Sequence, residues 1–195
     1  RPEDTVCYVP MTGRNERGIM KIKKIVLVGA MAALLALGAT ALAGCGGKSD
    51  ADVIRESLTQ ELDQVKNLDD AFLSEVTASA ETGGLDQFGI DAKELMKAYF
   101  GGFDYRIDDV TVEGDTAKAT ITLTCKSYQD YVDAITEAAL NSEDETAFGE
   151  NIMEAVNAIQ AREADPLELT YQKEGNTWNI TSEGQQALYS VLFAN

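Results

Sequence analysis

The apolar residues of this chain recur with two different periods, and the change between them limits which folds are possible. From Asp50 to Ser79 they recur every three or four residues, as on one face of an amphipathic helix. From Tyr105 the period becomes two, which is typical of a strand with one buried face. The helical period returns at Ser127, and the period of two returns after Pro166. The pattern therefore predicts an α+β fold.

Two β-hairpins are expected, over about residues 105–126 and 166–181. The first turns at Glu113–Thr116 and the second at Glu174–Asn176, where glycine lies between polar residues. Small or apolar residues share one face of the first returning strand: Ala117, Ala119, Ile121, Leu123 and Cys125. Lysines and threonines occupy its other face, so we expect a sheet with one buried side and one side in water.

Helices are expected before, between and after the hairpins, in the order ααββααββα. The polar stretch Asn67–Asp70 predicts a bend in the first helix, and Asp91 with Glu94 forms a capping-box pattern at the second. The expected helices cover residues 50–79, 91–100, 127–140 and 148–159, with a last one capped by Thr181 or Ser182. Because β-α-β alternation is missing, we expect residues 51–195 to form one α+β domain. Its antiparallel sheet would be covered by helices on a single face.

Residues 20–44 have the layout of a secretory signal peptide. A positively charged start contains Lys21, Lys23 and Lys24. The apolar run Ile25–Ala43 follows, and the segment closes on Leu42-Ala43-Gly44-Cys45. This closing sequence resembles the lipobox of bacterial lipoproteins.

The resemblance implies cleavage between Gly44 and Cys45 and attachment of a diacylglyceryl group to Cys45. Residues 45–50 would then be the lipidated cysteine and a short tether. We expect a protein lipid-anchored to the cell membrane, with its domain on the extracytoplasmic side. The lipid at Cys45 would bind the membrane, and the domain would bind an unknown protein or envelope component.

Two other interpretations are compatible with parts of this segment. The apolar run is nearly long enough to remain as a transmembrane helix. However, a box of small residues that ends in cysteine is the pattern of a cleaved signal. A plain secreted protein, cut near Ala43, would leave Cys45 without a role.

Residues 1–19 show neither a core pattern nor targeting features. Glu16–Met20 is compatible with the codons GAG-AGG-GGN-ATH-ATG, a purine-rich block just before a start codon. We therefore expect residues 1–19 to belong to an over-extended gene model, and we exclude them from the fold.

The net charge of the chain limits the classes of partner that the domain can bind. The chain has 16 Lys and Arg against 33 Asp and Glu, of which residues 1–44 hold 6 and 3, so residues 45–195 hold 10 and 30. A net charge of −20 disfavours nucleic acid, because affinity for phosphate comes from Lys and Arg. The same charge should hold the domain away from an anionic leaflet. Histidine, the commonest general base and metal ligand, is absent from the sequence.

A second resemblance concerns the hairpins. The segment Val112–Ile121 resembles the hairpin of small bacterial lipoproteins with NTF2-like domains, and Gly175–Ile180 resembles their late strand. The long helical insertion 127–163 departs from that pattern. The resemblance implies a pocket, for which the candidate aromatic residues are Tyr105, Tyr131, Tyr171 and Trp178. Asp104 or Asp130 would be its acid or base, although aromatic residues at such spacings also fill cores.

Motifs for catalysis and metal binding are missing from the sequence. It contains no nucleophile elbow, phosphate loop or Cys-x-x-Cys, so we expect no catalytic residues, metal site or cofactor. The acidic loop Asn141–Glu150 was considered for Ca²⁺, but Thr146 and Ile152 break the EF-hand pattern. Cys125 is expected to be a small buried hydrophobe, with a reactive thiol as the alternative.

Two hypotheses about function therefore stay open. The first is a non-enzymatic lipoprotein domain that binds a partner. The second is an NTF2-like domain that binds a small molecule or acts as an enzyme. A hollow lined by aromatic residues and a carboxylate would favour the second hypothesis.

Overall fold

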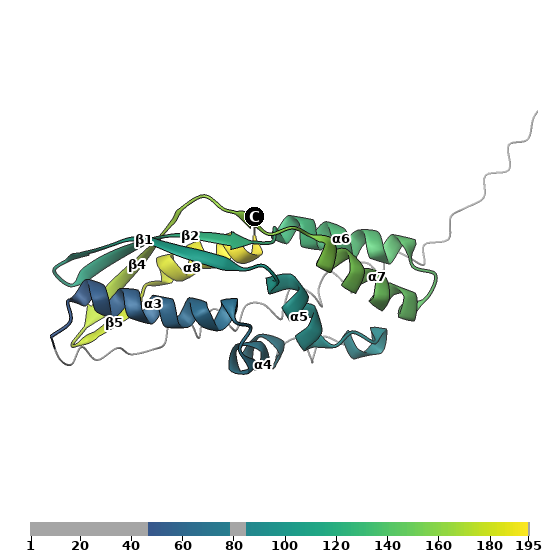
Figure 1. The fold of residues 1–195 in the computed structure, drawn as a ribbon, viewed down its shortest axis with the longest axis horizontal. Coiled ribbons are helices and arrows are strands. Elements are labelled where there is room, and N and C mark those ends of the chain that lie inside the picture. Colours follow the sequence, from purple (N-terminus) through teal and green to yellow (C-terminus); the bar gives the residue numbers. More distant parts are fainter. Residues whose placement is uncertain (1–46, 79–84, 195) are drawn as a thin grey trace, which may run out of the picture.

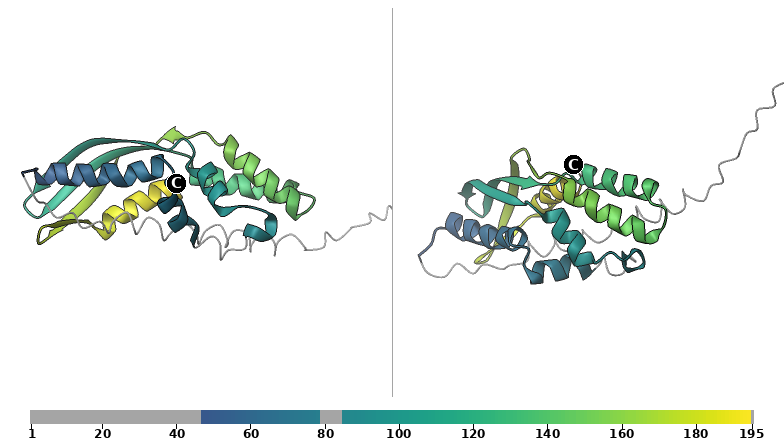
Figure 2. Two further views of the ribbon diagram at one scale, coloured as in Figure 1. Left: turned by 60° about the horizontal axis from the view of Figure 1, so that its bottom comes forward. Right: turned by 45° about the vertical axis from the view of Figure 1, so that its right-hand side comes forward.

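The computed structural model describes residues 47–78 and 85–194, which form an elongated body (Figure 1). A sheet and two helices make up one half of its length, and the remaining helices make up the other half (Figures 1 and 2). Segments 1–19 and 20–44, and the lipobox with Cys45, lie outside the described residues. None of the described helices is long and apolar enough to cross a membrane.

The sheet is antiparallel, with the strand order β1-β2-β4-β5 and a short β3 that pairs with the end of β2. The strands are β1 (Asp104–Glu113), β2 (Thr116–Cys125), β3 (Arg162–Glu163), β4 (Leu167–Glu174) and β5 (Thr177–Ile180). Both predicted hairpins are confirmed, and the sheet joins them through β2 and β4. The two-residue β3 was not predicted, because it is too short to show a period.

A β-bulge in β1 was also not predicted. Ile107 pairs with Ile121, whereas Asp109 pairs with Thr120, so Asp108 is the extra residue. The bulge follows from the sequence, because apolar residues occupy odd positions before it and even positions after it. One additional residue lets Ile107 and Val110 both face the core.

Helices α3 (Asp50–Lys66) and α8 (Ser182–Phe193) cover the buried face of the sheet side by side (Figure 2). Ser49 caps α3 in a capping box with Asp52, and Thr181 caps α8. Gly184 lets α8 approach the edge of β4, since a Cβ there would lie 2.9 Å from the backbone nitrogen and oxygen of Thr170. Two helices therefore cover one face, as the sequence predicted.

The predicted bend after α3 is a complete break. Asn67 ends α3, and Leu68 adopts a positive φ of 53° before α4 (Asp70–Ala78) begins. A 3₁₀ turn η2 (Leu85–Phe88) and α5 (Ala92–Phe100) follow. The Asp91 side chain accepts a hydrogen bond of 2.9 Å from the Glu94 backbone, which confirms the predicted cap.

The hairpin α6 (Tyr128–Asn141) and α7 (Glu145–Ala158) extends beyond the end of the sheet (Figure 1). We expected helices only on the face of the sheet, but α7 instead packs against α5 and η2. Gly149 permits this contact, because a Cβ at this position would overlap the carbonyl oxygen of Phe88. The lack of a side chain at Gly149 therefore allows α7 to pack against η2.

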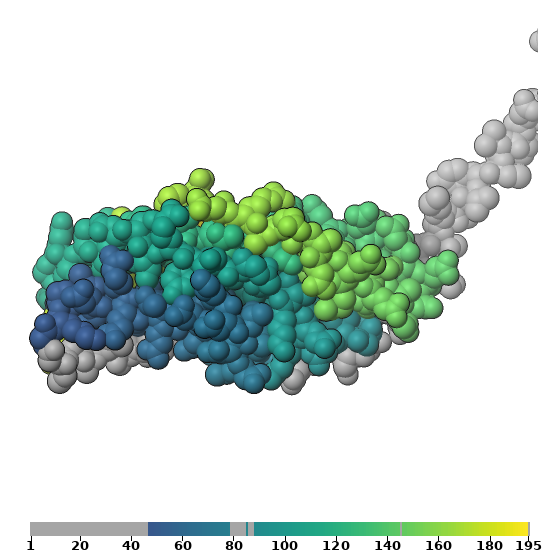
Figure 3. Space-filling model, viewed as in Figure 1, coloured from purple at the N-terminus to yellow at the C-terminus, as the bar shows by residue number. Residues whose placement is uncertain are grey.

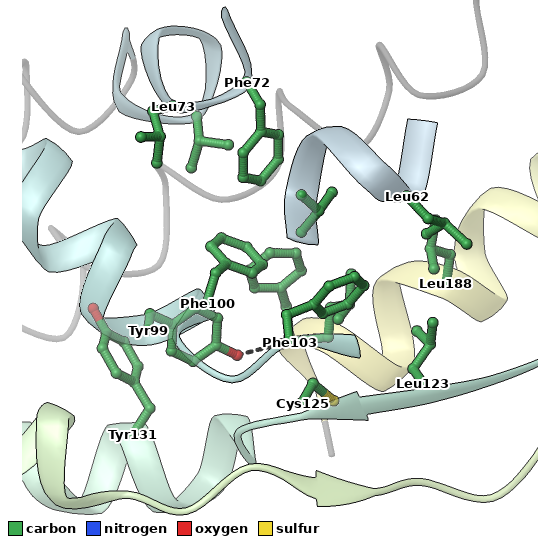
Figure 4. Packing of buried hydrophobic residues seen from close by; sticks show 14 of the residues in the cluster. Leu62, Phe72, Leu73, Tyr99, Phe100, Phe103, Leu123, Cys125, Tyr131 and Leu188 are labelled. Atoms are coloured by element: carbon green, nitrogen blue, oxygen red, sulfur yellow. Dashed lines mark hydrogen bonds between the residues drawn. The ribbon is translucent and has the colours of Figure 1, made fainter. Parts of the chain in front are cut away.

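One hydrophobic core runs through both halves (Figure 4). Tyr99 stands where they meet: its ring lies 4.7 Å from that of Tyr131, and its hydroxyl donates to the carbonyl oxygen of Leu192 at 2.5 Å. Cys125 is buried in the same core, as predicted, and burial raises the pKa of its thiol (Figure 4). Because the core is shared, we expect the two halves to unfold together.

Lys126 is the only lysine or arginine among the buried described residues, with 6% of its surface exposed. Its Nζ donates to the carbonyl oxygens of Ala98 and Val156, at 2.7 Å each. These carbonyls lie in the last turns of α5 and α7, where the helix dipole favours a cation. One ammonium group therefore fastens the end of β2 to two helices.

Candidate functional site: a polar groove on the open sheet face

The candidate site lies on the face of the sheet opposite α3 and α8. Along β2 the side chains alternate between the two faces, so the core receives Ala117, Ala119 and Ile121. The other face carries the lysine and the threonines of that strand. Lys118 stands between Thr111 of β1 and Thr170 of β4 in the register of the sheet. These three side chains therefore form one polar row across three strands.

A hollow of about 430 Å³ lies over this row and reaches the beginning of α8. Four threonines, two glutamates, one lysine and one glutamine line it, with contributions from two residues of the buried face. The lining residues are Thr111, Glu113, Thr116, Ala117, Lys118, Thr170, Tyr171, Gln172, Thr181 and Glu183. We call this hollow the sheet groove.

Internal contacts engage the lysine and two of the threonines of the sheet groove. Lys118 Nζ lies 2.9 Å from a carboxylate oxygen of Glu168, and this contact raises the pKa of the lysine. The hydroxyls of Thr170 and Thr181 share a hydrogen bond, which ties β4 to the start of α8. The groove thus presents hydroxyl and amide groups that donate and accept, while its two glutamates leave it with a negative charge that disfavours anions.

A second cluster closes the other end of the same face. Thr122 is buried and donates to Asp108 at 2.6 Å, while Arg106 donates to Asp108 at 2.5 Å and to Thr122 at 3.2 Å. These contacts lower the pKa of Asp108, the hydrogen bond from Thr122 more than that from Arg106. Because the bulge residue makes this cluster, the groove is confined to the end of the sheet that carries the hairpin turns.

The structure does not bring the four candidate aromatic residues into one pocket. Tyr131 and Trp178 are buried in the core, with 4% and 3% of their surfaces exposed. Tyr105 is half-buried, and its hydroxyl donates to Asp63 of α3 at 2.6 Å. Burial and the neighbouring Asp63 raise the pKa of Tyr105 to about 12. Of the four, Tyr171 alone lines the sheet groove.

The two candidate carboxylates lie in exposed ion pairs. Lys66 donates to Asp104 at 2.7 Å, which lowers the pKa of that carboxyl, and Arg162 donates to Asp130 at 2.5 Å. Neither aspartate lines the sheet groove. Within the described residues, no group of three or more Cys, Asp or Glu side chains is arranged to hold a metal ion.

Trp178 belongs to a cluster that fastens the beginning of α3 to the β4–β5 hairpin. Lys173 donates to Asp50 at 2.7 Å, and its Nζ lies 5.3 Å from the centre of the Trp178 ring. The pKa of Asp50 is lowered, first by the bond from Lys173 and then by the nearby indole N–H. That N–H makes no hydrogen bond of normal geometry to any described residue. The cluster fixes where the chain enters the domain.

The sequence predicted the polar face but not the groove in it. Alternation along β2 predicted that Lys118 and the threonines of that strand lie on the side in water, but Thr122 is buried beneath the contacts of Asp108 and Arg106. The register of β2 with β4, and the passage of α8 across the edge of β4, appear only in the structure. The glycine at position 184 was a sequence signal of this close approach, because its lack of a side chain lets α8 pass the backbone of Thr170.

Comparison with known proteins gives little further information. No protein-family model matches the chain, and no curated protein matches it. Among solved structures, a predicted lipoprotein from Bacillus subtilis, ycdA, is 16% identical with a TM-score of 0.40. The match covers 91% of this chain and 59% of that chain, so this chain spans well under two thirds of its length. At this level of similarity the match supports no assignment.

Proposed function

We propose that this protein is a lipid-anchored, extracytoplasmic binding protein without enzymatic activity. The observation that carries the proposal is the lipobox-like sequence Leu42-Ala43-Gly44-Cys45 behind a charged and apolar leader. Two or three acyl chains on Cys45 would hold the protein stably, because each buried methylene contributes about 0.8 kcal/mol. The role of the domain is then exerted at the membrane surface.

The position of α3 supports a defined orientation. The five residues from Gly46 to Asp50 reach at most about 17 Å, so α3 would begin close to the lipid headgroups. The Asp50–Lys173 ion pair holds that end of α3 to the β4–β5 hairpin. The same end of the body carries the β1–β2 turn (Figure 1). The α6–α7 hairpin would therefore point away from the membrane.

Within this proposal, the sheet groove binds a small uncharged polar ligand. Its threonine hydroxyls and the Gln172 amide both donate and accept, while Lys118 is already paired with Glu168. Anionic ligands would gain less, because the domain carries a net charge of −20. Both carboxylates that line the groove, Glu113 and Glu183, are exposed, whereas catalytic acids and bases are usually tuned by burial; we therefore propose binding rather than turnover.

Lipidation is tested by expressing the full chain in bacteria fed an alkyne-labelled fatty acid. We expect label on the wild type and none on Cys45→Ser, with Cys125→Ser as the matched control that keeps its label. Mass spectrometry of the mature N-terminus should find acylated Cys45. A wild-type chain that stays unlabelled or keeps residues 20–44 would overturn the proposal.

Groove binding is tested by recording amide chemical shifts of the domain with two uncharged probes, a blocked tripeptide amide and an N-acetylglucosamine trimer. We expect shifts at Thr111, Lys118 and Thr170 with at least one probe, and their loss in Thr111→Tyr, which fills the groove. Thr120→Tyr, on the same face outside the lining, is the control. Shifts that map elsewhere, or none at millimolar probe, would refute this role.

A further inference from the structure

Charge is distributed unevenly along the body. Residues 127–161, which contain α6 and α7, hold eight acidic side chains and no lysine or arginine. The hairpin they form lies at the end of the molecule opposite the start of α3 (Figure 3). Arg162, which follows this segment, pairs with Asp130, and the other seven acidic residues leave this end with a negative potential.

A groove of about 390 Å³ runs between α6 and α7 on this end. Its alanines are spaced three or four residues apart on each helix: Ala134 and Ala138 on α6, and Ala155 and Ala158 on α7. Glu137 and Glu154 stand beside them, one on each helix. The groove is thus lined by the methyl groups of four alanines, two carboxylates and the two amides of Asn141 and Asn151.

The shape of this groove fits a third helix. Small side chains at i, i+3 and i+4 leave room for the ridge of a neighbouring helix to enter. Leu140, 59% exposed, follows Glu137 by three positions and so lies next to it on the surface of α6. It is the one large hydrophobic residue that is strongly exposed in the described part of the chain.

The charge decides which helix could bind. A second copy of this chain would bring another net charge of −20 against the acidic end, and an anionic membrane would be repelled as well. A helix with lysine or arginine on both sides of a narrow apolar strip would instead place its cations against Glu137 and Glu154.

We propose that the α6–α7 groove is the docking site for a cationic amphipathic helix of another protein. Under the proposed function, the groove faces away from the membrane, where such a partner can reach it. Only this orientation rests on the lipid anchor. The docking itself does not rest on the lipid anchor. A negative result in the fatty-acid labelling assay would therefore leave the docking proposal standing, and a negative result in the binding assay below would leave the lipid anchor standing.

The test uses residues 46–195, since this segment contains the hydrophobic core formed by the described residues. The probe is a fluorescent 18-residue peptide of leucine, alanine and lysine with an amphipathic helical pattern, followed by anisotropy and circular dichroism. We expect micromolar binding that weakens with salt, a gain of peptide helicity, and amide shifts confined to α6 and α7. A peptide with glutamate in place of lysine should not bind.

Two variants separate docking from general attraction. Glu137→Gln with Glu154→Gln should weaken binding about fivefold, whereas the matched control, Glu75→Gln with Glu174→Gln, two exposed glutamates outside both grooves, should change it less than twofold. Ala155→Trp should fill the groove and abolish binding, with circular dichroism confirming that it is folded. Equal weakening by both glutamine pairs, or binding that persists in a folded Ala155→Trp variant, would overturn the proposal. So would the absence of binding at 100 μM peptide and low salt.

Discussion

The sharpest structural prediction concerns Lys126, whose ammonium group is buried and caps two helices at once. Replacement by methionine keeps most of the apolar stem but removes the bonds to Ala98 and Val156. Hydrogen bonds from a charged donor contribute about 1.5–3 kcal/mol each, and a cation at a helix C-terminus adds about 0.3–1 kcal/mol. Burial of the charge, which lowers the pKa of Lys126, offsets part of this gain.

We therefore expect Lys126→Met to lower the free energy of unfolding by about 2–3 kcal/mol. At this domain size the midpoint temperature should fall by about 4–12 °C. Urea denaturation at pH 7 measures the change, and Lys97→Met provides the control, since Lys97 is an exposed lysine in the last turn of α5. A Lys126→Met variant as stable as the wild type would refute the reasoning, because it would show that the cost of burying the ammonium equals what its two bonds contribute.

Three further predictions concern packing, reactivity and pH. Gly149→Ala should destabilise the domain by about 2–3 kcal/mol in urea denaturation, because its Cβ would overlap the Phe88 carbonyl; the exposed Glu150→Ala should cost little, and equal costs would contradict this account. The buried thiol of Cys125 should react with Ellman's reagent only in denaturant, and rapid reaction of the native protein would show that the site opens. The Asp108 carboxyl has a folded pKa below its usual 3.8, so its stabilising effect is present above that pH and is lost as the pH falls through the folded value. Thermal melts should thus show the wild type losing its advantage over Asp108→Asn below about pH 4, and a constant difference would refute the assignment.

Local patterns in the sequence predicted those parts of the fold that depend on neighbouring residues. Alternation gave both hairpins, and the Asp91 cap and the break at Asn67–Asp70 followed from their side chains. The placement of α6 and α7 beyond the sheet could not be predicted in this way. It depends on Gly149 meeting Phe88 and on Lys126 meeting two helix ends, which are contacts between residues far apart in the chain.

The site was harder to predict than the fold for the same reason. Tyr131 and Trp178 were candidates because aromatic rings often line pockets, but their spacing equally suits a core, and the core is where they lie. The sheet groove is built instead from threonines, which carry no distinctive sequence signal. Their number on one face becomes meaningful only when the register brings Thr111, Lys118 and Thr170 into a row.

The two proposed binding regions are connected through Lys126. The strand β2 carries Lys118 in the sheet groove near one end and is followed directly at its other end by Lys126, which holds α7. If the ammonium bonds set the angle between the sheet and the α6–α7 hairpin, Lys126→Met should also weaken the binding of a cationic helix. The sheet groove, whose residues make no contact with that ammonium, should keep its affinity in the same folded variant. Measuring both affinities in Lys126→Met therefore tests whether the distal end depends on its attachment to the sheet, and equal affinities in variant and wild type would show that the hairpin is held by packing alone.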